Sequence, residues 1–293
     1  MNDYQMPTDL PVIVNVSGGR TSAYLALKIA EHNPSVDNIV YLFQNTGRER
    51  EETLEFVRDL SIYDGLNIVW VEYCGDAPFF KVVNFETASR WNNPKPFDDL
   101  IEKRKYLPNV VERFCTEELK VKTARRYLRS VGIRQLYSVI GFRADEPRRV
   151  DKLQKRVLQA VNKLLASAAD NRKRTTEIPL TPLFQSGVTS HDVGKFWQNK
   201  NYDLKLPMLA NGKTVGGNCV GCFLHAECDR AAVSREEPEK WQWLLEKEAQ
   251  VGATFVKGVS AEELQKRANS DIVSEFGDDQ VFCVTAYGGC HDA

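Results

Sequence analysis

The chain has 293 residues, of which 42% are hydrophobic and 27% charged, and its formal net charge is −1. This length suits one large domain, or a core with an added unit. The near-neutral charge excludes a global positive field that would hold nucleic acid without specificity. No apolar run reaches the roughly 20 residues of a membrane-spanning helix, and the first residues lack the pattern of a secretory signal. We therefore expect a soluble, cytoplasmic protein without a membrane partner.

Short apolar runs alternate with helical patterns, which is typical of a parallel sheet covered by helices. In chain order the pattern predicts a strand at 12–16, a helix at 22–32, a strand at 39–43, a helix at 51–60, a strand at 68–71, a basic amphipathic helix at 116–131, a strand at 136–140 and a helix at 151–169. Residues 75–112 contain four prolines and few periodic runs, so we expect a surface excursion there.

From about residue 178 the predicted elements become shorter and a cysteine-rich loop follows. The fold class expected from the whole pattern is α/β, with a parallel sheet covered by helices. We expect this sheet in a first domain of residues 1–177, followed by a smaller cysteine-containing unit of residues 178–293.

A glycine-rich loop joins the first predicted strand to the first predicted helix. It reads Ser17-Gly18-Gly19-Arg20-Thr21-Ser22. Glycines let a backbone approach a ligand closely, and N–H groups at a helix start favour negative charge. The hydroxyls add donors and Arg20 adds charge. We expect this loop to wrap a phosphate or sulfate group; the alternative is a tight turn that binds nothing. It is not a Walker A motif, because no Gly-Lys-Ser/Thr follows.

Two further polar segments follow predicted strands. The first contains Asn45-Thr46-Gly47, and the second reads Gly141-Phe142-Arg143-Ala144-Asp145-Glu146-Pro147-Arg148-Arg149. Guanidinium groups bind phosphate or sulfate oxygens in bidentate fashion, and Asn and Thr side chains can hydrogen-bond a base or ribose. The alternatives are a solvated basic loop and simple turn formers.

These segments, in this order, resemble motifs of the phosphoadenosine phosphosulfate (PAPS) reductase family and of its relatives, the PP-loop ATP pyrophosphatases. The glycine loop is similar to Ser-Gly-Gly-x-Asp-Ser, residues 45–47 to Asp-Thr-Gly, and residues 141–149 to Gly-x-Arg-x-x-Glu-Ser-x-x-Arg. Cys115 and Lys120 are similar to a Cys…Lys segment, and the resemblance covers roughly residues 11–235.

The resemblance implies a Rossmann-like, doubly wound, mostly parallel sheet with helices on both faces, which makes residues 1–177 a nucleotide-binding domain. It also implies an adenine nucleotide lying across the carboxyl ends of the strands, at a topological switch point. The residues that it implies as nucleotide ligands are Ser17, Gly18, Gly19, Arg20, Thr21, Ser22, Asn45, Thr46, Gly47, Gly141, Arg143, Glu146, Arg148 and Arg149. Two positions depart from the family, since Thr21 and Asn45 stand where it has Asp. Each change removes a carboxylate that could orient Mg²⁺. Nucleotide binding is therefore better supported than ATP cleavage.

Three of the seven cysteines, Cys219, Cys222 and Cys228, follow a C-x2-C-x5-C spacing. Four thiolates suit zinc or an iron–sulfur cluster, and spacing alone does not choose between them. Cys115 is the natural fourth ligand, and His225 competes for that place and would favour zinc. Some branches of the resembled family carry a [4Fe–4S] cluster, so we expect a cluster first, zinc second and free thiols third.

Cys290, near the end of the chain, is a candidate nucleophile whose pKa the adjacent His291 would lower. In the reductase hypothesis Arg143 and Arg149 act beside Cys290 on a sulfonucleotide, and a thiol reductant protein completes the reaction. In the alternative, ATP is cleaved and an adenylated nucleic acid or small molecule accepts sulfur from a cysteine-desulfurase-type donor. A third hypothesis is a nucleotide-binding module that turns nothing over.

Overall fold

The computed structural model describes residues 3–166, 176–207 and 216–269, except for the side chains of 160–166. The chain divides into two compact units. The first contains Met1–Phe43, Phe56–Val69 and Ala124–Asp203, and the second contains Gln44–Glu55, Trp70–Thr123 and Leu204–Ala293. Both units combine early and late segments, because parallel strands adjacent in a sheet are far apart in sequence. These spatial units are not the two sequence segments predicted above as domains. The domain boundary between residues 177 and 178 stays a prediction.

A six-stranded sheet has the order β4-β3-β2-β1-β5-β6. Its strands are β1 (Val12–Asn15), β2 (Ile39–Asn45), β3 (Ile68–Glu72), β4 (Lys81–Val83), β5 (Gln135–Val139) and β6 (Thr176–Leu180). β1 pairs in parallel with β2 and β5, β5 pairs in parallel with β6, and β4 is antiparallel to β3. The predicted mostly parallel sheet is confirmed. The strand order reverses at β1, which makes its carboxyl end a topological switch point.

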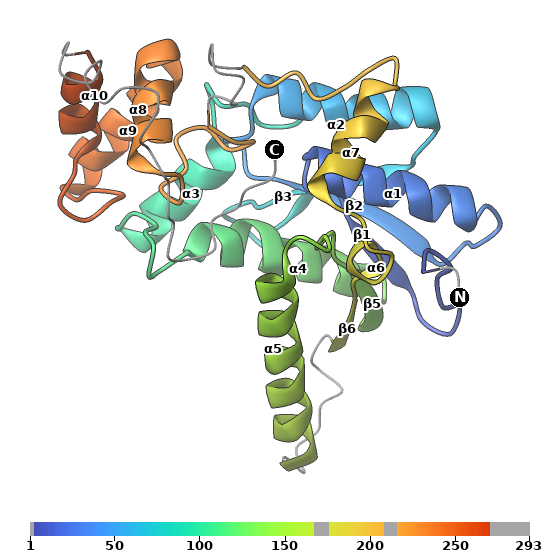
Figure 1. Ribbon diagram of the computed structural model, residues 1–293. Helices are drawn as coiled ribbons and strands as arrows, with labels where there is room; N and C mark the ends of the chain where they lie inside the picture. Colours follow the sequence, from blue (N-terminus) through green and yellow to red (C-terminus); the bar gives the residue numbers. More distant parts are fainter. Residues whose placement is uncertain (1–2, 167–175, 208–215, 270–293) are drawn as a thin grey trace. The chain divides into compact units, whose positions relative to one another are not determined.

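β1 is buried on both faces, and Val12, Ile13 and Val14 are all at most 2% exposed. The helices around this part of the chain are α1 (Arg20–His32), α2 (Glu51–Asp64), α4 (Thr123–Ser130), α5 (Pro147–Ala166), α6 (Pro182–Gln185) and α7 (Ser190–Gln198). Figure 1 shows α1 and α4 on opposite sides of the strands, as right-handed crossovers require when the strand order reverses. The predicted doubly wound arrangement is confirmed.

The second unit contains α3 (Lys95–Arg104), α8 (Glu227–Glu236), α9 (Pro238–Val251) and α10 (Ala261–Asn269). Its apolar cluster joins Phe97, Leu100 and Ile101 of α3 to side chains of the later helices, among them Trp241, Leu244 and Leu264. The predicted surface excursion at 75–112 is therefore wrong for α3. Pro96 lies in the first turn of this helix, where a missing N–H costs nothing, so the prolines do not prevent a core helix.

The single helix predicted at 116–131 is also wrong in its first half. Residues Cys115–Lys122 form a π-helix that continues into α4. At the junction the Thr123 hydroxyl donates to the Glu118 carbonyl, at 2.7 Å, and so supplies a local bond at the change of helix type.

Among the helices that the structure describes, none combines the length and the apolar character needed to cross a lipid bilayer.

The role of α3 in the core gives a stability prediction. Leu100 is 1% exposed within the apolar cluster, so Leu100→Ala should lower the free energy of unfolding by about 2–5 kcal/mol. Glu102, which is exposed on the same helix, is the matched control, and Glu102→Ala should change it by less than about 0.5 kcal/mol. Urea denaturation measures both variants. Equal effects would show that α3 does not pack in the core.

Candidate functional site

The glycine loop connects β1 to α1 at the switch point of the sheet. Gly18 has φ +82°, in the left-handed region that favours glycine, and α1 begins after Gly19. The Ser17 and Ser22 hydroxyl oxygens lie 2.8 Å apart, and the Ser22 hydroxyl accepts from the Ser17 N–H at 3.0 Å. The first N–H groups of any α-helix point outward along its axis without an intrahelical acceptor. The loop is therefore braced by its own serines around the start of α1, the part of a helix that attracts anions.

The loop after β5 lies against this helix start. A Cβ atom added at Gly141 would be 3.6 Å from Thr21 Cγ2 and 3.8 Å from Ser22 Cα. Arg143 is only 6% exposed, and its Nη1 donates to Thr21 Oγ1 at 3.0 Å. Parallel pairing of β1 with β5 explains the contact, because it brings both carboxyl ends to one edge. The glycine loop and the loop after β5 are therefore in contact, through two residues that are 122 positions apart in the sequence.

The acidic groups of the β5 loop organise its arginines. Arg143 Nε donates to Asp145 Oδ1 at 3.0 Å, and Glu146 Oε2 accepts from the Arg143 backbone N–H at 3.1 Å. Burial raises the pKa of Asp145, but hydrogen bonds from Ser190 and Arg143 outweigh it, so the net pKa lies below its ordinary value. Arg149 donates to Glu146 at 2.5 Å and stacks 4.3 Å from the centre of the Phe142 ring. The loop is thus held in place by its own charges.

The other two arginines of the predicted site, Arg20 and Arg148, do not share the contacts of Arg143 and Arg149. Arg20 forms a bidentate ion pair with Asp203, at 2.7 and 2.6 Å, so its charge is compensated by a residue that the sequence did not single out. Arg148 is exposed and forms no ion pair with any residue that the structure describes. No sequence pattern indicated Asp203, since a contact across 183 positions leaves no local signal.

The segment Asn45-Thr46-Gly47 lies in the second unit. Asn45 is fully buried, and its Nδ2 donates to Glu72 Oε1 and to the Ser89 carbonyl, at 2.5 and 2.9 Å. The Thr46 hydroxyl donates to Glu49 Oε2 at 2.8 Å. These side chains fix the turn in which they lie. Their contact with a nucleotide stays a prediction.

Arg48 and Arg50, to which the sequence assigned no role, are both at most 1% exposed. Arg48 donates to the Trp91 carbonyl at 3.0 Å and lies 4.3 Å from the centre of a Trp243 ring. Burial lowers its pKa to about 10. Arg50 donates to the Gly217 carbonyl at 3.0 Å and forms a close ion pair with Glu237.

The same segment holds the cysteine-rich loop through its backbone. The Val220 N–H donates to the Arg48 carbonyl at 2.9 Å, and the Arg50 N–H donates to the Asn218 carbonyl at 2.8 Å. Glu49 and Cys219 form an antiparallel bridge between these two bonds. Residues 48–50 therefore position the C-x-x-C turn.

Cys115, Cys219 and Cys222 are partly buried. Burial raises the pKa of Cys219 well above its ordinary value; Cys222 and Glu49 add to the rise, and Lys120 and Arg48 oppose it. Burial also raises the pKa of Cys115, again opposed by Lys120. Lys120 in turn pairs with Glu49 Oε1 at 3.5 Å. Three predicted ligands, Cys115, Cys219 and Cys222, thus belong to one network of charges.

The remaining predicted metal ligands are Cys228 and His225. Cys228 is exposed in the first turn of α8, and the ring of His225 lies beside Gly217, where an added Cβ would be 2.9 Å from it. Among the described residues, no three His, Cys, Asp or Glu side chains are grouped closely enough to hold a metal ion as they stand. Cys290 and His291 lie outside the described residues.

Comparison with known proteins finds a relative in sequence. The chain is 29% identical over 218 residues to the uncharacterized nin region protein ORF290 of Escherichia phage lambda, an alignment that covers 72% of this chain. The chain spans 65% of the length of that relative. No family model matches the chain.

Two solved structures are similar to the chain at a distance. One is phosphoadenylyl-sulfate (PAPS) reductase from Candida auris in a phosphate complex, with 12% identity, a TM-score of 0.39 and coverage of 68% of this chain and 76% of the other. The second is the U34-tRNA thiolase NcsA from Methanococcus maripaludis with its [4Fe–4S] cluster, with 13% identity, a TM-score of 0.39 and coverage of 86% and 75%. These values are too low for either activity to be transferred to this chain.

Proposed function

We propose that this chain is an enzyme that binds an adenine nucleotide at the carboxyl end of β1 and carries out sulfur chemistry on it, in the manner of the PAPS reductase family. One observation carries the proposal: the Arg143 guanidinium, on the loop after β5, donates to Thr21 at the start of α1, at 3.0 Å. This contact sets a buried cation beside the outward N–H groups of a helix. Such a pair suits the oxygens of a phosphate or sulfate group.

The charges near this contact support an anionic ligand without a bound metal ion. Thr21 supplies a hydroxyl where the resembled family has a carboxylate, so the loop itself adds no negative charge. Arg148 is exposed on the first turn of α5, without an ion pair to the described residues. It is therefore available to an incoming sulfate or phosphate oxygen.

The chemistry that we favour is reduction of a sulfonucleotide. The Cys290 thiolate attacks the sulfur atom, the bond between sulfur and the bridging oxygen breaks, and the nucleotide leaves with that oxygen on its 5′ phosphate. The sulfur stays on the enzyme as a thiosulfonate. An external thiol then attacks the sulfur of Cys290, which releases sulfite and leaves a disulfide that a second thiol reduces. In this scheme Arg143 and Arg149 neutralise charge on the sulfate and phosphate oxygens.

The second candidate is ATP-dependent sulfur transfer, and the cysteine arrangement favours it. Cys115 follows Phe114, a core residue that is 3% exposed, so no second thiol stands beside it. One distant cysteine together with C-x2-C-x5-C is the pattern that resembles sulfur-inserting enzymes of this family. The substrate would be adenylated with release of pyrophosphate. The outer sulfur of a persulfide on a desulfurase-type donor would then displace AMP, and an external thiol would reduce the disulfide that joins substrate and donor.

We also propose that Cys115, Cys219, Cys222 and Cys228 hold a [4Fe–4S] cluster, with zinc as the second choice. The donor set fits by its chemistry, because thiolates suit both groups, and Lys120 and Arg48 would offset the negative charge that thiolates bring. The described side chains are not gathered into a formed metal site, so the four cysteine side chains would have to move closer together. When bound, a cluster supplies electron transfer or a sulfur-binding iron.

Nucleotide binding tests the first proposal. Arg143→Met should weaken binding of ATP and of adenosine 3′,5′-bisphosphate by about 10- to 100-fold, the loss expected for hydrogen bonds from a charged group. Arg125→Met is the control, since Arg125 pairs with Glu177 on the surface. This variant should bind both nucleotides as tightly as the wild type does. Calorimetry measures both, and circular dichroism checks folding. Equal affinities for the two variants would exclude the Arg143 site.

Metal content tests the cysteine proposal. Protein purified without oxygen should be brown and contain about four iron atoms per chain, and Cys219→Ser should lose both properties. Cys74→Ser is the control, because Cys74 lies outside the spacing pattern and donates to the Asp76 carbonyl. Elemental analysis gives the outcome. About one zinc atom per chain in the wild type would show that the cysteines hold zinc and not a cluster. No metal in the wild type would show that they are free thiols.

Product analysis separates the two reactions. We expect sulfite from PAPS or adenylyl sulfate in the presence of a dithiol, and none from Cys290→Ser, because the thiolate that accepts the sulfur is absent. Cys283, the preceding cysteine in the sequence, belongs to none of the predicted motifs, so Cys283→Ser is the matched control and should release sulfite at the wild-type rate. Pyrophosphate from ATP instead would establish the second candidate. Nucleotide binding with neither product would leave a binding module without turnover.

A further inference from the structure

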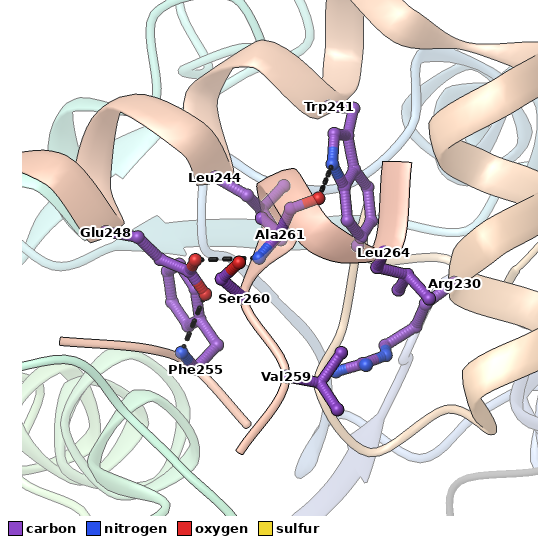
Figure 2. A pocket seen from close by; sticks show the side chains of 10 residues that line it. Arg230, Trp241, Leu244, Glu248, Phe255, Val259, Ser260, Ala261 and Leu264 are labelled. Carbon is purple, nitrogen blue, oxygen red and sulfur yellow. Dashed lines mark hydrogen bonds between the residues drawn. The ribbon is translucent and has the colours of Figure 1, made fainter. Parts of the chain in front are cut away.

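A small cavity lies among α8, α9, α10 and the segment before α10 (Figure 2). Its wall is largely apolar, with Trp241, Leu244, Phe255 and Leu264 as its main side chains. The cavity leaves about 10 Å³ for the centre of a water-sized molecule, which is room for one such occupant. All of its lining residues belong to the second unit.

Most polar groups in the wall already have partners. Trp241 Nε1 donates to the Ala261 carbonyl at 3.1 Å. The Glu248 carboxylate accepts from the N–H groups of Phe255 and Ala261, at 3.0 and 2.7 Å, as the dashed lines in Figure 2 show. Ser260 Oγ accepts from the Glu263 N–H at 3.0 Å, which leaves its hydroxyl proton able to donate.

Arg230 is the exception. It is 6% exposed, and its guanidinium makes no hydrogen bond or ion pair with the residues that the structure describes; its Nε is buried without an acceptor. The carboxylates that affect it from a distance are bound elsewhere, since Glu227 pairs with Arg267 at 3.2 Å and Glu248 holds the two N–H groups. Cys222 also acts on it from a distance, and burial lowers its pKa. A buried cation without a partner is costly.

We propose that this cavity binds one small monovalent anion, of which chloride is the natural representative, with Arg230 as its cationic ligand. The guanidinium extends from α8 into the cavity toward Val259 (Figure 2), and the Ser260 hydroxyl is the second donor available there. The size of the cavity favours a single atom over sulfate or phosphate. The Glu248 carboxylate in the same wall disfavours an anion of higher charge.

The anion would join α8 to the start of α10 and would stabilise the segment that carries the C-x-x-C turn. Gly221, between Cys219 and Cys222, is part of the cavity wall, and a Cβ added there would be 2.7 Å from a Leu244 methyl. A bound anion therefore fixes the packing under this turn. The proposal stands independently of the contact between Arg143 and Thr21 that carries the nucleotide proposal, since both residues belong to the other unit.

Thermal unfolding of the full chain tests this site. At constant ionic strength, replacing gluconate by chloride should raise the midpoint of the wild type by about 2–4 °C, the shift expected when a ligand binds only the folded state. Arg230→Met should show no such rise. It should also be more stable than the wild type in gluconate, because it removes an uncompensated buried charge. Arg235→Met, on the same helix and paired with Glu236 at the surface, should keep the chloride response.

A second measurement detects binding itself. Chloride-35 resonances broaden when the ion exchanges with a protein site, and Arg230→Met should remove the broadening while Arg235→Met keeps it. Equal chloride responses of the wild type and Arg230→Met in both measurements would overturn the proposal. A response to sulfate but not to chloride or bromide would overturn the assignment of a small monovalent anion.

Discussion

The candidate nucleotide site depends on the parallel pairing of β1 with a strand on each side. β2 and β5 flank β1, so the chain leaves β1 toward one side of the sheet and returns to it from the other. Loops that follow parallel strands meet at the carboxyl edge, which is why the glycine loop and the β5 loop lie in contact. The hydrogen bond between Arg143 and Thr21 joins them. Without this strand order, Arg143 would be one more basic residue in a surface loop.

Internal charge pairing prepares the two loops before any ligand is present. Glu146 accepts from the backbone of Arg143 and from the side chain of Arg149, so one carboxylate orients two arginines. Asp145 accepts from Arg143, and Asp203 engages Arg20. An anion that binds here would meet donors that are already oriented, which reduces the entropy lost on binding. The site then resembles a preorganised anion cradle more than a flexible basic patch.

The second unit uses buried arginines in a different way. Arg48 and Arg50 bond to backbone carbonyls and hold the cysteine-rich loop against residues 48–50. Their charge is distributed over carbonyl dipoles, an indole ring and one carboxylate, so burial is tolerated. Arg230 lacks such partners in the described part of the chain. This contrast within one unit is the reason for assigning an anion to Arg230 and not to the other two.

The sequence by itself determined strands β1, β2, β3 and β5 and the chemical types at the site, because buried strands are continuous apolar runs and the glycine, arginine and cysteine motifs are local patterns. It did not predict β4 or β6. It failed at α3, where prolines concealed a core helix, and at Cys115–Lys122, where helical spacing did not distinguish a π-helix from an α-helix. Only the tertiary structure decided the partners. Arg20 meets Asp203, Arg50 meets Glu237, and Asn45 meets Glu72, across 183, 187 and 27 positions. Pairing between distant residues depends on how the elements pack, and packing leaves no periodic signal in one sequence.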